Sequence, residues 1–168
     1  MEKNKKLDDL PYIGKEFSVS FELFLDSYPA ADVPYVNVLH LTREDDGQKL
    51  GNRIPGVWIK PTKELHESFS INGDWNSVAN HAVESGKWNK VEINQKLVDG
   101  KVVILISVDT YSFIHYFQYM FEVLLNGESK RSIENTTPEK YENVTVFASN
   151  PWYPAADGKI RYLRIITS

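Results

Sequence analysis

Apolar and polar residues alternate along much of this chain. Between residues 16 and 25, apolar side chains occupy every second position and polar side chains lie between them, with Phe17, Val19, Phe21, Leu23 and Leu25 on the apolar side. A period of two is typical of a β-strand that buries one face and exposes the other. The pattern therefore predicts a half-buried strand over residues 16–25.

Similar short runs recur along the chain, at residues 35–41, 53–60, 68–72, 91–97, 102–108, 121–125, 144–149 and 160–165. Turn-forming pairs such as Asp99-Gly100 and Asn126-Gly127 lie after some of them. Pro55 and Gly56 within residues 53–60 favour an edge strand or a bulge. Only residues 75–83 have a spacing that would fit a helical turn. About nine short strands predict an all-β protein in which two antiparallel sheets pack as a sandwich.

In this sandwich the buried positions follow from the same alternation. We expect these apolar side chains to lie in the core: Phe21, Leu23, Val91, Ile93, Ile104, Ile106, Val123 and Ile160.

Composition narrows the function classes. The chain of 168 residues is 42% hydrophobic, which suffices for one domain with its own core, and it contains no cysteine. Its net charge of −4 argues against nucleic-acid binding, which normally uses a basic surface. No apolar run approaches the ~18 residues of a membrane span. The lysines at the start are followed by Asp8 and Asp9, which indicates a solvated terminus without the apolar core of a signal peptide.

Several segments together resemble the concanavalin A-like jelly-roll superfamily, and within it the laminin-G-like and pentraxin-like modules. The resembling segments are Phe17-Ser-Val-Ser-Phe-Glu-Leu, Asn52-Arg-Ile-Pro-Gly-Val-Trp-Ile, Gly86-Lys-Trp-Asn-Lys-Val-Glu-Ile-Asn-Gln, Phe121-Glu-Val-Leu-Leu-Asn-Gly-Glu and Asp157-Gly-Lys-Ile-Arg-Tyr-Leu-Arg-Ile. The resemblance implies a jelly-roll β-sandwich over residues 16–168, preceded by an N-terminal extension of residues 1–15. It also implies an extracellular or secreted location.

The superfamily includes lectins, glycan hydrolases, lyases and protein-binding modules, so the fold alone does not choose among them. Its hydrolases carry Glu-x-Asp-x-x-Glu or Glu-x-Asp-x-Glu on one strand, because glycoside hydrolysis needs two positioned carboxyl groups. Here Glu44-Asp45-Asp46 begins such a pattern, but Gly47-Gln48-Lys49 follows without the second glutamate. We therefore interpret residues 44–46 as a solvated turn and expect no enzymatic activity.

Laminin-G-like and pentraxin-like modules often bind calcium at one rim, and the resemblance makes Asp74 and Asp109 candidate ligands near strand ends. The alternative is that Asn72-Gly73-Asp74 is only a turn and that Asp109 ends a strand. The four histidines lack zinc-ligand spacing. We expect His40 to be a half-exposed strand residue and His81 a loop residue.

Aromatic residues carry the clearest functional signal. A ring face can stack on the apolar side of a sugar while nearby polar groups bind its hydroxyls. The candidate ligand-binding residues are Asp74, Trp75, Tyr111, His115, Trp152 and Tyr153. If loops carry the function, Trp152 and Tyr153 should lie near Trp75 or residues 111–115, with Asp74 and Asp157 beside them. The alternative is that these aromatics fill the core, with Trp152 plugging one end of the sandwich.

Three functions stay open on the sequence. The first is a non-catalytic recognition module that binds a glycan or glycosylated partner. The second is a protein-interaction or structural module of the same fold, and the third is a polysaccharide-active enzyme of an unfamiliar branch. Exposed aromatics beside polar groups favour the first, an apolar sheet face the second, and close carboxyl groups in a groove the third.

Overall fold

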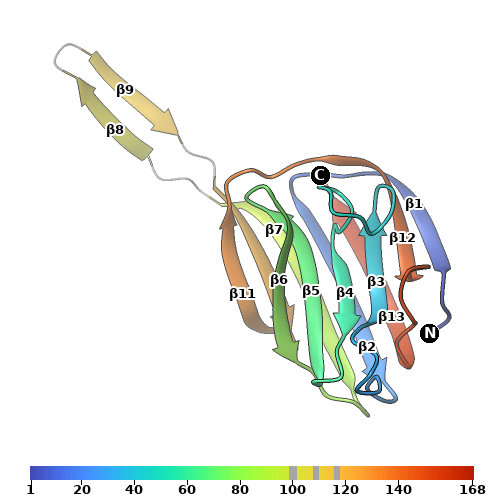
Figure 1. Cartoon of the computed structure of the whole chain (residues 1–168). Helices are drawn as coiled ribbons and strands as arrows, with labels where there is room; N and C mark the ends of the chain where they lie inside the picture. The colour runs from blue at the N-terminus through green and yellow to red at the C-terminus, as the bar shows by residue number, and fades with distance from the viewer. Residues whose placement is uncertain (99–101, 108–109, 116–117) are drawn as a thin grey trace.

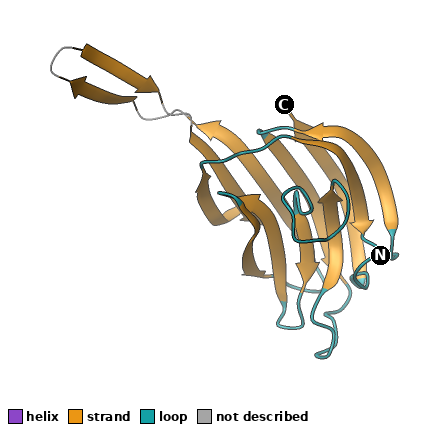
Figure 2. Cartoon of the chain, turned by 45° about the horizontal axis from the view of Figure 1, so that its top comes forward, coloured by secondary structure: helices purple, strands orange, loops and turns teal. Residues whose placement is uncertain are grey.

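The protein is all-β. The structure, a computed structural model, describes residues 1–98 and 118–168 together with the backbone of 102–107 and 110–115. Throughout these residues the chain forms strands and loops without a helix, as Figure 2 shows. No helix in these ranges is long and apolar enough to cross a membrane. The described strands are β1 (Lys5–Ile13), β2 (Phe17–Leu25), β3 (Val36–Thr42), β4 (Gly56–Ile59), β5 (Glu64–Ile71), β6 (Asp74–Ala82), β7 (Trp88–Val98), β8 (Val102–Ser107), β9 (Thr110–His115), β10 (Gln118–Leu125), β11 (Glu128–Asn135), β12 (Tyr141–Ser149) and β13 (Gly158–Thr167).

Two antiparallel sheets form the sandwich and lie face to face (Figure 1). The first has six strands in the order β1-β12-β3-β4-β5-β6, and the second has five in the order β11-β10-β7-β2-β13. Strands β8 and β9 pair with each other in a two-stranded sheet. Several neighbouring strands, such as β12 with β3 and β2 with β13, are distant in sequence, as in a jelly roll. The predicted two-sheet jelly-roll sandwich is confirmed.

The core lies between the two sheets. Every apolar residue of the alternating run in β2 is buried. Phe69 of β5 stacks on Phe121 of β10 at a ring-centroid distance of 4.9 Å and contacts Phe17 of β2 at 5.2 Å, so it joins the two sheets. The predicted burial is confirmed for Phe21, Leu23, Val91, Ile93 and Val123, whereas Ile160 is only partly buried. The side chains of Ile104 and Ile106 lie outside the described part of the chain.

Strands β1, β6 and β11 form where the apolar pattern does not predict them. Of residues 75–83, which have the spacing of a helical turn, residues 75–82 belong to β6 instead. Residues 5–13, expected to be solvated, pair with β12 from Lys5 opposite Ser149 to Ile13 opposite Tyr141. These strands lie at sheet edges and carry many exposed polar side chains, so backbone pairing holds them more than burial does.

Strand β4 lies inside its sheet, between β3 and β5, so the prediction of an edge strand there is wrong. The register between β3 and β4 shifts between Asn37 and Leu39, but the extra residue, Val38, lies on β3 and not within residues 53–60, where the bulge was predicted. Pro55 lies before the first paired residue of β4, and its missing N–H therefore interrupts no ladder within the strand.

Candidate ligand-binding face

The outer face of the six-stranded sheet is formed by residues that alternate along each strand with residues of the core. Trp58 lies between Val57 and Ile59, both completely buried in the core, so its side chain points to the opposite face. Cross-strand partners share a face. The outer face therefore carries two rows across β3, β4, β5 and β6, namely His40-Gly56-Ser68-Val78 and Asn37-Trp58-His66-Asn80.

Gly56 makes room for the Trp58 ring on this face. A Cβ atom added at Gly56 would lie 2.2 Å from Cη2 of Trp58, which is far too close for two carbon atoms. The ring therefore lies over the glycine of its own strand. Trp58 is only 2% exposed and forms part of the floor of the face.

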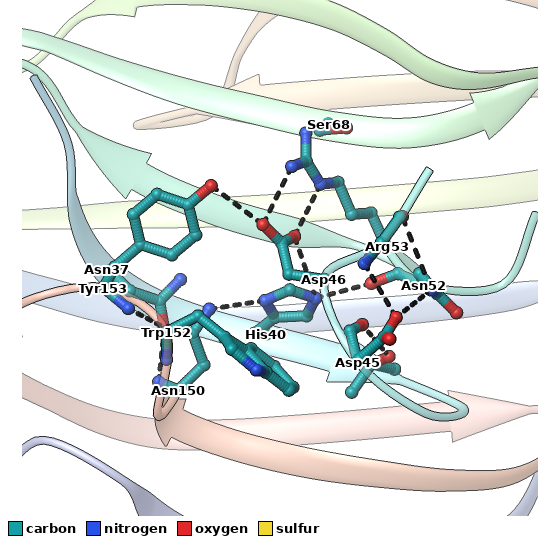
Figure 3. A network of polar contacts seen from close by, with 12 residues as sticks. Asn37, His40, Asp45, Asp46, Asn52, Arg53, Ser68, Asn150, Trp152 and Tyr153 are labelled. Atoms are coloured by element: carbon teal, nitrogen blue, oxygen red, sulfur yellow. Dashed lines mark hydrogen bonds and ion pairs between the residues drawn. The ribbon is translucent and has the colours of Figure 1, made fainter. Parts of the chain in front are cut away.

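The loop between β3 and β4 brings Asp46 and Arg53 over this floor (Figure 3). Arg53 donates from Nε to Oδ1 of Asp46 at 2.7 Å and from Nη2 to Oδ2 at 2.9 Å. Both side chains are about one-tenth exposed, at 12% and 10%. This bidentate geometry, with two parallel hydrogen bonds, is the strong arrangement for an arginine and a carboxylate.

Aromatic rings flank the Arg53 guanidinium. Its central carbon lies 5.1 Å from the ring centroid of Trp58 and 5.1 Å from that of Trp75, within cation–π range. Its Nη1 donates to Oδ1 of Asn76, which also accepts from Ser68 Oγ at 2.8 Å. Three of the five N–H groups of Arg53 are thus occupied by these contacts, and the others can serve a ligand.

The loop between β12 and β13 covers the other side of the floor. The Asn150 side-chain oxygen accepts hydrogen bonds from the backbone N–H groups of Trp152 and Tyr153 at 3.1 and 3.0 Å. The Tyr153 hydroxyl donates to Oδ2 of Asp46 at 2.8 Å (Figure 3). Burial, with help from the hydrogen bond to Asp46, raises the pKa of Tyr153 to about 12. Tyr153 therefore stays a neutral donor at neutral pH.

His40 lies beneath this loop and is completely buried, so the prediction of a half-exposed residue is wrong. Asn150 Nδ2 donates to its Nδ1 at 2.7 Å, and its Nε2 lies 2.6 Å from the Asn52 carbonyl oxygen. An acceptor at Nδ1 and a donor at Nε2 define the neutral tautomer that carries its proton on Nε2. Burial lowers the pKa of His40 from 6.5 to about 4.

We predict that His40 makes the fold sensitive to acid. Between pH 6.5 and 4 the unfolded chain binds a proton on this residue while the folded chain does not, so stability is complete above pH 6.5 and falls as the pH drops to about 4. The loss should be roughly 3 kcal/mol. In urea unfolding from pH 7 to pH 4, the stability advantage of the wild type over a His40→Gln variant should shrink by that amount. Parallel curves for the two proteins would show that His40 has no such role.

A hollow lies above the floor of the outer face, with a volume of about 220 Å³. We call it the sheet-face hollow, and it is lined by Tyr35, Arg53, Trp58, His66, Asn76, Val78 and Tyr153. Burial lowers the pKa of His66, so this histidine is a neutral group at pH 7. The Trp58 indole N–H is buried and has no hydrogen-bond partner within the described residues. Buried indole N–H groups normally have an acceptor, so a polar ligand in this hollow would complete the site.

The structure brings together some of the residues predicted from sequence. Trp75 contacts Arg53, and Tyr153 contacts Asp46. Trp152 precedes Tyr153 in the same loop. Asp157 instead accepts a hydrogen bond from Ser27 Oγ at 2.7 Å. Of the two other predicted residues, Tyr111 and His115, only the backbone in β9 is described.

Asp74 serves the turn between β5 and β6. Its Oδ1 accepts a hydrogen bond from the Asn76 backbone N–H at 2.9 Å, and Asn72 and Gly73 have the positive φ angles of a tight hairpin. Within the described ranges, no group of three His, Asp or Glu side chains could hold a metal ion. Asp109, the other candidate calcium ligand, lies outside these ranges.

The sequence pattern does not predict the polar centre of the site. The interpretation of residues 44–46 as a solvated turn is wrong for Asp46, which is nearly buried between Arg53 and Tyr153. His81, expected in a loop, lies on β6. The available signal was the position of Trp58 between Val57 and Ile59, which places a tryptophan opposite the core on an otherwise apolar strand.

The two sheets have the jelly-roll β-sandwich fold that concanavalin A-like proteins share. No protein-family model and no curated protein matches the chain. Among solved structures, it is similar to a heptameric SAP-like pentraxin from Limulus polyphemus, with a TM-score of 0.57, 13% identity, and coverage of 98% of this chain and 71% of that one. A variant of human galectin-16 gives a TM-score of 0.49 at 15% identity, with 98% and 99% coverage. The carbohydrate-binding module CBM66 from Bacillus subtilis gives 0.44 at 9%, with 99% and 84% coverage.

Proposed function

We propose that this protein is a non-catalytic recognition module that binds one sugar ring of a glycan in the sheet-face hollow. The observation that carries the proposal is that Trp58 lines the hollow while its buried indole N–H has no hydrogen-bond partner in the described residues. An unsatisfied buried donor costs about 1 to 3 kcal/mol, and a sugar hydroxyl would supply the acceptor.

The other walls of the hollow suit a sugar. Tyr35 and Tyr153 are half-buried and so keep some ring surface for the apolar side of a pyranose. Arg53 and Asn76 offer fixed polar groups for hydroxyls. The volume of about 220 Å³ lies below the about 300 to 1,000 Å³ of drug-sized pockets, which favours a single ring.

The proposal extends to the absence of catalysis and to an extracellular setting. Both oxygens of Asp46 are engaged by Arg53, and one also by Tyr153, so this carboxylate is held as a structural acceptor. Glycoside hydrolysis needs a second positioned carboxyl group, for which the sequence has no matching motif. The extracellular setting follows from the superfamily resemblance.

A second candidate function is protein interaction through the outer side of the five-stranded sheet. There the Arg161 guanidinium lies 3.8 Å from the ring centroid of Trp88 and 4.9 Å from that of Tyr162. Tyr162 is 72% exposed on an edge strand. Exposed tyrosine, tryptophan and arginine are enriched in protein interfaces.

Filling the sheet-face hollow should abolish glycan binding. Val78 lines the hollow and is 41% exposed, so a Val78→Trp variant should block the hollow and leave the core unchanged. On a glycan array, we expect the wild type to bind a defined set of glycans and Val78→Trp to bind none of them.

The matched control is Ile166→Trp, which changes another exposed aliphatic residue, 47% exposed, on β13 of the other sheet. It should bind like the wild type. If Val78→Trp keeps the binding profile, or if Ile166→Trp alone loses it, the sheet-face hollow is not the site.

A further inference from the structure

We propose a second sugar subsite beside the first, between Trp152 and the loop of residues 45–47. It would take a second, uncharged ring of the same ligand, so that the ligand class is a neutral oligosaccharide of two or more units. This inference rests on the proposed function of the sheet-face hollow and adds the length and charge of its ligand.

The second subsite is a separate hollow of about 400 Å³, which we call the loop hollow. It is lined by Asp45, Asp46, Gly47, Trp152 and Tyr153. Tyr153 lines both hollows, and its hydroxyl is hydrogen-bonded to Asp46, which lines the second. The two hollows therefore adjoin across Tyr153, and a ligand that extends beyond the sheet-face hollow on this side would enter the loop hollow.

Trp152 gives the loop hollow an aromatic platform. Its side chain is 41% exposed. The backbone N–H of Trp152 donates a hydrogen bond to the Asn150 side chain, and the Trp152 ring lies near His40 (Figure 3). The ring-centroid distances are 5.6 Å to His40 and 6.0 Å to Phe147. A ring that is already fixed in place loses little conformational entropy when a sugar stacks on it. An exposed but immobilised tryptophan is thus suited to binding and is not explained by core packing.

The charge of the loop hollow selects against acidic sugars. Asp46 is neutralised by Arg53, whereas the Asp45 carboxylate accepts hydrogen bonds, within the described residues, from the Gly47 backbone N–H and the Asn52 side chain, both at Oδ1. Its carboxylate can accept hydrogen bonds from sugar hydroxyls through Oδ2. A uronate or sulfate group would meet a like charge in this hollow.

Calorimetry with four tetrasaccharides and their monosaccharides tests the second subsite. The probes are cellotetraose, maltotetraose, laminaritetraose and lacto-N-tetraose, together with glucose and galactose. For the wild type, we expect at least one tetrasaccharide to bind more tightly than its monosaccharide. Trp152→Ala should weaken the affinity for that tetrasaccharide about tenfold and leave the affinity for the monosaccharide unchanged. Trp152→Phe keeps a ring and should therefore retain most of the wild-type affinity for the tetrasaccharide.

An Asp45→Asn variant tests the charge, because the amide oxygen can keep the hydrogen bond to Gly47. Tetragalacturonate should bind this variant at least several-fold more tightly than it binds the wild type. The subsite is overturned if Trp152→Ala weakens monosaccharide and tetrasaccharide equally, or neither. If Trp152→Ala gives one of these results while Val78→Trp abolishes sugar binding, the sheet-face hollow is the site and the second subsite does not exist. If the wild type binds none of these sugars, both the proposed function and the second subsite are contradicted.

Discussion

Replacing Asp46 with alanine should lower the free energy of unfolding by about 3 to 5 kcal/mol. The change would leave the Arg53 guanidinium, 12% exposed, and the Tyr153 hydroxyl without their carboxylate acceptor. A nearly buried charge without its partner is strongly destabilising. Urea unfolding at pH 7 measures the effect, and loss of glycan binding should accompany it because Arg53 would no longer be held over Trp58.

Glu44→Ala is the matched control. Glu44 lies in the same loop and pairs with Lys49, but the two side chains are 58% and 68% exposed. An exposed pair of this kind contributes at most about 1 kcal/mol. If Asp46→Ala and Glu44→Ala have the same small effect, the Arg53–Asp46 pair is a surface ion pair and does not organise the site.

The second large effect is expected at Phe69. Phe69→Ala should destabilise the protein by about 3 to 5 kcal/mol, because the ring is 1% exposed and stacks on Phe121 at 4.9 Å with planes 13° apart. Phe24→Ala should cost well under half as much, since Phe24 is half-buried and packs on Trp88 outside the core. Thermal unfolding of both variants compares them. Equal losses would mean that the inter-sheet contact of Phe69 is not central to the core.

The fold was predictable where burial shapes the sequence. Strand β2 has one face in the core, so its apolar side chains recur with period two and its position follows from the sequence. Strands β1 and β11 lie at sheet edges with few buried side chains, and their sequences lack that period. The central strand β3 is buried on both faces, which removes the polar half of the alternation and blurs its limits.

The site was predictable only in part, for a related reason. Trp152 and Tyr153 stand out because large aromatics between two prolines are unusual. Asp46 and Arg53 are only seven residues apart, but their pairing depends on the fold of the loop between β3 and β4. An aspartate before a glycine is typical of a solvated turn, whether or not an arginine further along the chain forms an ion pair with it. The burial of Asp46 is a tertiary effect that local pattern does not encode.

The most direct test of the account uses the four tryptophan indoles of the chain as reporters. Trp58 lines the sheet-face hollow, Trp75 contacts Arg53, and Trp152 lines the loop hollow, whereas Trp88 stacks with Arg161 on the five-stranded sheet. In nitrogen-15 NMR spectra recorded during titration with a bound glycan, the Trp58 indole N–H signal should shift most, because it gains a hydrogen-bond acceptor. The Trp88 signal should stay in place. Saturable binding that moves Trp88 and leaves Trp58 unchanged would contradict the account and place the ligand on the opposite sheet.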